Sequence, residues 1–348
     1  MTAIRSLNKP QITIASAPAD PEQGWRAAMR DLVTSPAALC QALQLQPEQL
    51  GWSDDAARQF PLRVPRAFVT RMVPGDPRDP LLLQVLAGVR ELQPAPGFGP
   101  DPTGEIGAAN PHPGIIHKYR GRLLLLVTGS CAIHCRYCFR RHFPYADNQN
   151  SRSEWSSALD YIRRDPSISE VILSGGDPLV AGDTQLAELV AQLATIPHVR
   201  RLRVHTRLPV VIPQRVTPEL LDALSSPQLK TVIVVHCNHG NEIDSEVAGA
   251  FAMIRQHGMT LLNQAVLLSG INDSATALSR LSERLFEAGA LPYYLHLLDR
   301  VTGAAHFEVS AERARALHRE ISATLPGYLV PRLVREVAGA PAKVMLPV

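Results

Sequence analysis

Cysteine is scarce in this sequence, and the few cysteines present do not fit a disulfide framework. The 348 residues contain five cysteines, an odd number. Disulfide-stabilised proteins are usually short secreted chains with an even cysteine count. Met1 to Asp20 carry charges and prolines without the apolar stretch of a secretory signal. We therefore expect reduced thiols and a cytoplasmic location.

A strong net charge and long hydrophobic runs are also lacking. The formal net charge of +3 is too small to indicate a nucleic-acid partner. No apolar run approaches the ~20 residues of a membrane-spanning helix. Hydrophobic residues still make up 45% of the chain, enough for a substantial core. A chain of this length predicts one large domain with an N-terminal appendage.

Three of the five cysteines lie within eight residues, in the spacing C-x3-C-x2-C. These are Cys131, Cys135 and Cys138, and they follow an apolar run that reads as a buried strand. Three thiolates on one loop can bind three irons of a [4Fe–4S] cluster. Since most such clusters have four cysteines, the fourth iron is left for another ligand. Zinc prefers four ligands in paired spacings, and only His134 and His142 could complete such a set, so the pattern favours the cluster.

The C-x3-C-x2-C spacing resembles the signature of the radical S-adenosylmethionine (SAM) enzymes. In that family the amino and carboxylate groups of SAM bind the fourth iron, and the reduced cluster cleaves SAM to release a carbon radical. A second stretch, Ser174-Gly175-Gly176-Asp177, resembles the glycine-rich segment that holds the SAM amino group. Its glycines would let the backbone approach a ligand closely, although the stretch by itself also fits a simple turn.

From residue 123 onward, the pattern alternates between strands and helices. The predicted strands are 123–127, 170–174, 201–205, 231–236, 260–267 and 291–297. The predicted helices are 152–164, 183–195, 216–225, 243–257, 274–288 and 310–324. Such alternation favours a parallel α/β sheet covered by helices. Six units fit a partial (β/α)6 TIM-like barrel with its chemistry at the carboxyl ends of the strands, and an open doubly wound sheet is the alternative.

The residues before this barrel are predicted to be helical and then irregular. Helical spacing runs through 21–60, and a short helix is expected at 79–86. The Pro- and Gly-rich stretch 93–114 reads as a linker. We divide the chain into an N-terminal helical region with linker, a radical SAM barrel and a C-terminal segment, at 1–115, 116–325 and 326–348.

Polar residues gather at the predicted strand ends. His205 ends the third strand, His236 ends the fourth, and Asn263 and Gln264 interrupt the apolar run of the fifth. These histidines could be ligands or ordinary polar lining. Buried amides must be paired, and a bound cofactor is one possible partner. Lys343 lies in a Gly/Ala/Pro-rich stretch near the C-terminus, where composition alone would favour a solvated lysine.

From about Phe60 to its end, the sequence resembles the lysine 2,3-aminomutase family. The motifs that carry this resemblance are Leu62-Arg63-Val64-Pro65-Arg66, Asp79-Pro80-Leu81-Leu82, His117-Lys118-Tyr119, Cys135-Arg136-Tyr137-Cys138-Phe139-Arg140-Arg141-His142-Phe143-Pro144-Tyr145, Ser174-Gly175-Gly176-Asp177-Pro178, Leu262-Asn263-Gln264, Pro292-Tyr293-Tyr294-Leu295-His296, Gly303-Ala304-Ala305-His306-Phe307 and Gly327-Tyr328-Leu329-Val330-Pro331. The resemblance implies a partial barrel, a [4Fe–4S] cluster, SAM, pyridoxal phosphate (PLP) and a homo-oligomer. Within the family, the branch that makes (R)-β-lysine for elongation factor P is the most similar.

The resemblance also assigns cofactor contacts. It implies that the three clustered cysteines bind iron and that Lys343 holds PLP. Lys118 and Arg122 match basic positions near the PLP phosphate, although the free-lysine mutases have arginine at the first. The remaining candidate cofactor contacts are Ser174, Gly175, Gly176, Asp177, His236 and Gln264.

Three further residues match the substrate contacts of the family. Arg140 matches an arginine that pairs with the substrate carboxylate, for which a bidentate guanidinium is suited. Asp299 and Glu336 match two acids that bind the ε-ammonium of lysine. The free-lysine mutases have aspartate at the second position and a longer C-terminal segment with a zinc site, whereas this chain ends five residues after Lys343. Both departures favour the elongation factor P branch.

The leading hypothesis is a radical SAM, PLP-dependent isomerase that converts L-lysine to β-lysine. Moving the amino group from C2 to C3 breaks a Cβ–H bond whose hydrogen is not acidic, so a side-chain base cannot remove it at a useful rate, whereas a carbon radical can abstract it as a hydrogen atom. A separate ligase would attach the product to elongation factor P, and the cluster requires an electron donor that the sequence leaves unidentified. A free-standing L-lysine 2,3-aminomutase of lysine metabolism is the second hypothesis. A non-catalytic iron–sulfur or zinc protein is the third.

Overall fold

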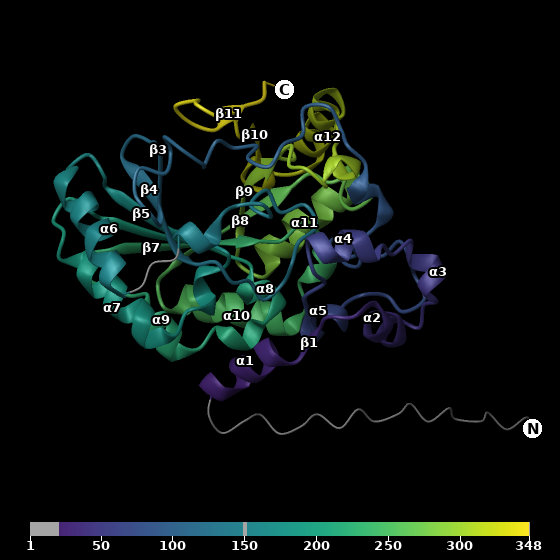
Figure 1. The fold of residues 1–348 in the computed structure, drawn as a ribbon, viewed down its shortest axis with the longest axis horizontal. Coiled ribbons are helices and arrows are strands. Elements are labelled where there is room, and N and C mark those ends of the chain that lie inside the picture. The colour runs from purple at the N-terminus through teal and green to yellow at the C-terminus, as the bar shows by residue number, and fades with distance from the viewer. Residues whose placement is uncertain (1–20, 149–151, 348) are drawn as a thin grey trace, which may run out of the picture.

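A nine-stranded sheet forms the centre of the molecule (Figure 1). The computed structural model describes residues 21–148 and 152–347. Along the sheet the strands follow the order β11-β10-β9-β8-β7-β6-β5-β4-β3. They are β3 (Ile115–Tyr119), β4 (Arg122–Thr128), β5 (Glu170–Gly175), β6 (Arg201–Thr206), β7 (Lys230–His236), β8 (Thr260–Val266), β9 (Leu291–His296), β10 (Arg332–Arg335) and β11 (Val344–Met345). The six predicted strands are confirmed as β4 to β9.

Strands β4 to β10 are parallel, and β3 and β11 flank them in antiparallel pairs. The strand order follows the chain without reversal, whereas a doubly wound sheet reverses its order at a switch point. The doubly wound alternative is therefore wrong. Because β3 and β11 are the edges of this sheet, it is an open, partial barrel, as predicted.

Each parallel strand from β4 to β9 is followed by a helix that lies outside the sheet (Figure 1). These helices are α6 (Arg152–Arg164), α7 (Asp183–Ala194), α9 (Pro218–Ala223), α10 (Ser245–Gln256), α11 (Ala275–Glu287) and α12 (Ala311–Thr324). Helix α11 shows how the local sequence specifies a helix, through its N-cap and its apolar face. Ser274 caps its first turn by accepting a hydrogen bond from the Ala277 amide, and Leu278, Leu281 and Leu285 form its buried stripe. All six predicted helices are confirmed.

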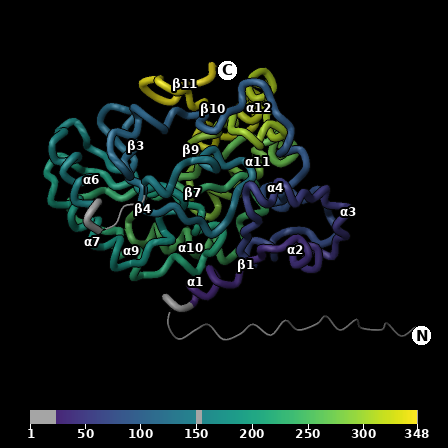
Figure 2. The backbone as a smooth tube through the Cα atoms, in the orientation of Figure 1, coloured from purple at the N-terminus to yellow at the C-terminus, as the bar shows by residue number. Residues whose placement is uncertain are grey.

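The N-terminal region packs beside the barrel as small helices and a two-stranded ribbon (Figure 2). Its elements are α1 (Pro21–Arg30), β1 (Leu32–Val33), α2 (Pro36–Leu43), α3 (Pro47–Leu50), α4 (Asp54–Gln59), β2 (Val64–Pro65) and α5 (Arg66–Val69). The predicted helix at 79–86 is wrong, since this stretch forms turns. The Asp79 carboxylate accepts hydrogen bonds from the Leu81 and Leu82 amides, and the Gln84 carbonyl accepts one from Arg136.

Short helical turns complete the structure. They are α8 (Leu208–Val211), η1 (Val89–Leu92), η2 (Tyr145–Asn148), η3 (Pro178–Val180), η4 (Pro213–Arg215), η5 (Gly240–Glu242), η6 (Ala305–Phe307) and η7 (Gly327–Leu329). Residues 93–114 contain no helix or strand, as predicted for a linker. All five cysteines are free thiols, and Cys40 and Cys237 are buried. None of the helices in the described residues has the length and apolar composition to cross a membrane.

Candidate active site

A cavity of about 500 Å³ opens inside the barrel, and every residue to which the family resemblance gives a metal, cofactor or substrate contact lines it. The candidates lining it are Cys131, Cys135, Cys138, Lys118, Arg122, Arg140, Ser174, Gly175, Gly176, Asp177, His236, Gln264, Asp299, Glu336 and Lys343. They come from β3 through β9, from the loops that follow these strands and from the C-terminal segment. The fold thus gathers residues that are more than 200 positions apart in the chain, as Lys118 and Glu336 are.

The three cysteines lie on the loop that follows β4. Burial raises the pKa of the Cys131 thiol well above its usual value, and the neighbouring Cys138, Asp177 and Cys135 raise it further. Burial, followed by the charge of Cys135, raises the pKa of Cys138 to about 11. Iron would reverse this trend, because a bound cation stabilises the thiolate. This mutual proximity of free, half-buried thiols fits a metal-cluster loop.

The two histidines of the zinc alternative are each engaged by a backbone carbonyl. The Nδ1 atom of His134 lies 2.8 Å from the Pro61 carbonyl oxygen, and its ring stacks on Phe60. The Nε2 atom of His142 lies 3.2 Å from the Thr302 carbonyl oxygen. In the described part of the chain, no three His, Cys, Asp or Glu side chains form a group that could hold a single metal ion. A four-iron cluster has no such requirement, because each of its cysteines binds a different iron.

The glycine-rich loop after β5 packs directly on the cysteine loop. Gly176 donates from its amide to the Thr128 carbonyl at 2.7 Å. A Cβ atom on Gly175 would lie 2.4 Å from the Thr128 carbonyl oxygen, and one on Gly176 would lie 2.4 Å from that of Ser130. Gly175 also has a φ of +122°, which other residues rarely adopt. Only glycine allows the two loops to meet at the cavity wall.

Asp177 is tied into the protein rather than left open to the cavity. Its Oδ1 atom accepts hydrogen bonds from the Leu179 amide and the Thr206 hydroxyl, and its Oδ2 atom accepts them from the Arg207 and Leu208 amides. Burial raises the pKa of this carboxyl, and these hydrogen bonds oppose the rise. In this structure Asp177 therefore fixes the shape of the loop, while Ser174 and the two glycines form the wall.

Lys343 and Lys118 share a single carboxylate. Lys343 Nζ lies 2.7 Å from Glu336 Oε2, and Lys118 Nζ lies 2.7 Å from Glu336 Oε1. Tyr119 donates its hydroxyl to the same Oε1 atom. Burial raises the pKa of Glu336, but the two lysines outweigh burial and bring it to about 2. Glu336 is thus a firmly ionised bridge between the C-terminal segment and β3, which the sequence did not reveal.

Arg140 is already paired with an acid. Its Nε and Nη2 atoms donate to both carboxylate oxygens of Glu105 at 2.6 and 2.9 Å, and its Nη1 atom donates to Ser174 Oγ at 2.8 Å. Burial lowers the pKa of Arg140, but the Glu105 carboxylate outweighs it and raises that pKa above its usual value. Glu105, which lies in the irregular stretch 93–114, was not among the predicted site residues. In the sequence, Glu105 is a single acid within a stretch predicted as an irregular linker, and nothing there marked it as a buried residue.

Three histidines line the cavity as neutral rings. Burial lowers the pKa of His236 to about 3, and it lowers those of His205 and His296 well below the usual value. His236 Nε2 lies 2.9 Å from the Gln264 side-chain nitrogen. Among the described residues, the buried Nε2 atoms of His205 and His296 have no hydrogen-bond partner. Such orphaned atoms in a cavity wall fit a site that holds a polar ligand.

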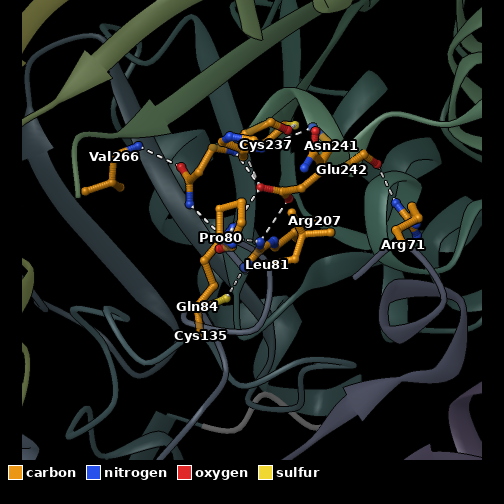
Figure 3. Close-up of polar contacts among 12 residues, drawn as sticks. Arg71, Pro80, Leu81, Gln84, Cys135, Arg207, Cys237, Asn241, Glu242 and Val266 are labelled. Atoms are coloured by element: carbon orange, nitrogen blue, oxygen red, sulfur yellow. Dashed lines mark hydrogen bonds and ion pairs between the residues drawn. The ribbon is translucent and has the colours of Figure 1, made fainter. Parts of the chain in front are cut away.

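A buried polar cluster contacts the cysteine loop through Arg207 and Cys135 (Figure 3). Arg207 donates to Cys135 Sγ, and it also pairs with Glu242, a fully buried acid on η5. Gln84 and Asn238 complete the cluster through hydrogen bonds to Arg207, Glu242 and Tyr137. Asn263, one of the two amides noted in the sequence, pairs with the Cys237 backbone instead of facing the cavity.

Comparison with known proteins adds a family context to this geometry. Residues 125–279 match the model of the Radical SAM superfamily. The L-lysine 2,3-aminomutase of Escherichia coli strain K12 is 49% identical over 325 residues, covering 93% of this chain and 94% of that protein. The enzyme of that name from Haemophilus influenzae is 49% identical, covering 93% and 96%. The one from Clostridium subterminale is 32% identical, covering 92% and 76%.

Proposed function

Because the chain belongs to the L-lysine 2,3-aminomutase family of radical SAM enzymes, we propose that it converts L-lysine to (R)-β-lysine for attachment to elongation factor P. One observation carries the proposal. The three-cysteine loop, the glycine-rich loop, Arg140 and the C-terminal Lys343 with its acid partner line a single cavity. A non-catalytic iron–sulfur protein would need the cysteine loop but not Arg140 or Lys343.

The residues present fit the three cofactors of the proposal. Cys131, Cys135 and Cys138 would hold the cluster, and the Ser174–Gly176 wall would contact SAM. Lys343 would hold PLP, and the basic residues Lys118 and Arg122 would contact its phosphate. When bound, these groups supply a carbon radical that can take the Cβ hydrogen and a carrier for the migrating amino group.

Charged residues of the cavity would bind the two ends of the substrate, a positive one at its carboxylate and two negative ones at its ammonium. Arg140 would bind the carboxylate of lysine, and Asp299 with Glu336 would bind its ε-ammonium. The neutral histidines of the wall add no charge that would compete with this pairing. We further propose that segment 326–348 is the element that delivers Lys343. Its strand β10 pairs with β9, and β11 pairs with β10, so the sheet itself positions this lysine.

The direct test is product formation by the reconstituted protein. With SAM, PLP, dithionite and L-lysine under anaerobic conditions, we expect (R)-β-lysine by chiral chromatography, and none with L-glutamate. In a host that lacks the chain, the intact mass of elongation factor P should show loss of the β-lysyl group. β-Lysine in the assay with unchanged elongation factor P would favour a free-standing mutase. Absence of β-lysine from protein with a full cluster and SAM cleavage would contradict free lysine as the substrate.

Asp299 predicts the pH dependence of the reaction. Burial, helped by Glu336 and Glu105 and opposed by Lys343, raises its pKa to about 7. A raised pKa leaves this carboxyl protonated and neutral at lower pH, where it cannot pair with the substrate ammonium. We therefore expect kcat/KM for lysine to rise as the pH increases through about 7, because this parameter reports groups of the free enzyme. Asp299→Asn should be slower and lack this rise; a rise that persists in the variant would exclude Asp299 as its source.

A further inference from the structure

Arg207 joins the cysteine loop to a fully buried glutamate (Figure 3). It follows β6, and its side chain is 6% exposed. Its Nη1 atom donates to Cys135 Sγ at 2.7 Å and to the Tyr137 hydroxyl at 2.8 Å. Its Nη2 atom donates to Glu242 Oε2 at 2.9 Å. A buried positive charge therefore lies in hydrogen-bond contact with a sulfur atom of the C-x3-C-x2-C motif.

The surroundings hold this guanidinium in place. The Arg207 amide donates to Asp177, and its Nη2 atom also donates to Gln84 Oε1 at 2.6 Å. Glu242 is fixed in turn, since its Oε1 atom accepts hydrogen bonds from the amides of Asn238 and His239. Gln84, Asp177 and the segment 238–242 are three separate parts of the chain. The donor to Cys135 is thus preorganised and does not depend on a mobile side chain.

We infer that Arg207 is a positioning residue that raises the reduction potential of an iron–sulfur cluster bound at Cys131, Cys135 and Cys138, and that Glu242 moderates the effect. The inference rests on the cluster site of the proposed function. Reduction transfers one electron from an external reductant to the cluster, which becomes one unit more negative. A hydrogen bond and a nearby positive charge stabilise that added charge, and they do so more strongly in a buried site than in water.

Because Arg207 and Glu242 carry opposite charges, removing either charge should shift the reduction potential in opposite directions. Arg207→Gln removes the positive charge beside Cys135 and should lower the reduction potential. Glu242→Gln removes the negative charge that partly neutralises Arg207, so it should raise the potential. Arg207→Lys keeps the charge, but one ammonium group cannot replace the guanidinium fork that spans Cys135 and Glu242. Its potential should fall between those of the wild type and Arg207→Gln.

The measurement is a redox titration of the reconstituted protein without lysine or SAM. Each variant is loaded with iron and sulfide, its cluster content is checked by iron and sulfide analysis, and reduction by dithionite is followed by electron paramagnetic resonance. For Arg207→Gln we expect an about tenfold smaller equilibrium constant for reduction, which corresponds to 59 mV in a one-electron couple. Arg215→Gln is the matched control. It breaks the ion pair of another buried arginine with the partly exposed Asp183, and this pair has no cysteine contact, so the potential should not change.

The outcomes separate this inference from the proposed function. Wild-type protein that loads no cluster would contradict the cluster site itself. A loaded cluster whose potential is unchanged by Arg207→Gln, or shifts in the same direction in Arg207→Gln and Glu242→Gln, would overturn the role of Arg207. If Arg207→Gln loads no cluster, Glu242→Gln decides alone: an upward shift supports the inference, and no shift or a downward one overturns it.

Discussion

Replacing Lys343 with alanine is expected to abolish β-lysine formation, lowering kcat/KM by roughly 10³-fold or more, the scale seen when a covalent catalytic group is removed. The substitution takes away the amine through which the protein would hold PLP. We therefore expect the visible absorbance of protein-bound PLP to disappear as well. Cluster content and cluster reduction should not change, because the cysteines lie on a separate loop. Loss of PLP with retention of the cluster would show that Lys343 holds PLP and has no part in binding the cluster.

The fold should tolerate the Lys343→Ala change. Glu336 would lose one of its two lysines, yet it would retain Lys118 at 2.7 Å and the Tyr119 hydroxyl. Lys230→Ala is the matched control, since this exposed lysine begins β7 outside the cavity. Its activity and PLP absorbance should equal those of the wild type. Wild-type β-lysine formation by the Lys343→Ala variant would contradict the assignment of Lys343.

The alternating units of the barrel could be predicted because each is long and strongly patterned. Strand β5, for example, is buried along its whole length, and an uninterrupted apolar run bounded by polar residues is a direct sign of such a strand. The strands β3, β10 and β11, at or next to the edges of the sheet, were missed for the opposite reason. They are short, and β3 includes the polar pair His117 and Lys118. Their pairing depends on the neighbouring strand more than on their own sequence.

The site candidates were predictable where a motif names them, and less so where only the fold brings groups together. The cysteines, the glycine-rich loop and Lys343 all line the cavity. Glu105 and Glu242 gave no comparable signal, since an isolated glutamate is expected to be solvated. Both are buried because each meets an arginine distant in the chain: Arg140 is 35 residues from Glu105, and Arg207 is 35 residues from Glu242. Such pairs are properties of the tertiary structure.

The pairing of Arg140 with Glu105 leads to the second large expected effect. Arg140 uses Nε and Nη2 on Glu105 and Nη1 on Ser174 and the Gly175 carbonyl, so most of its donors are already engaged. A lysine at this position keeps the charge but cannot reproduce the planar fork. We expect Arg140→Lys to lower kcat/KM for lysine by roughly 10²-fold, because changes at a buried hydrogen-bonded ion pair commonly cost several kcal/mol.

Glu105 occupies the donors that the substrate carboxylate would need in the proposed role of Arg140, so the two carboxylates would compete for this arginine. Glu105→Gln removes the competing charge while its amide oxygen can still accept one hydrogen bond from the guanidinium. This variant should therefore have a lower KM for lysine, opposite in direction to Arg140→Lys. Steady-state kinetics of the two single variants and the double variant would measure the coupling. A raised KM in Glu105→Gln would instead mean that Glu105 orients Arg140 for the substrate, because losing an orienting partner weakens binding and losing a competitor strengthens it.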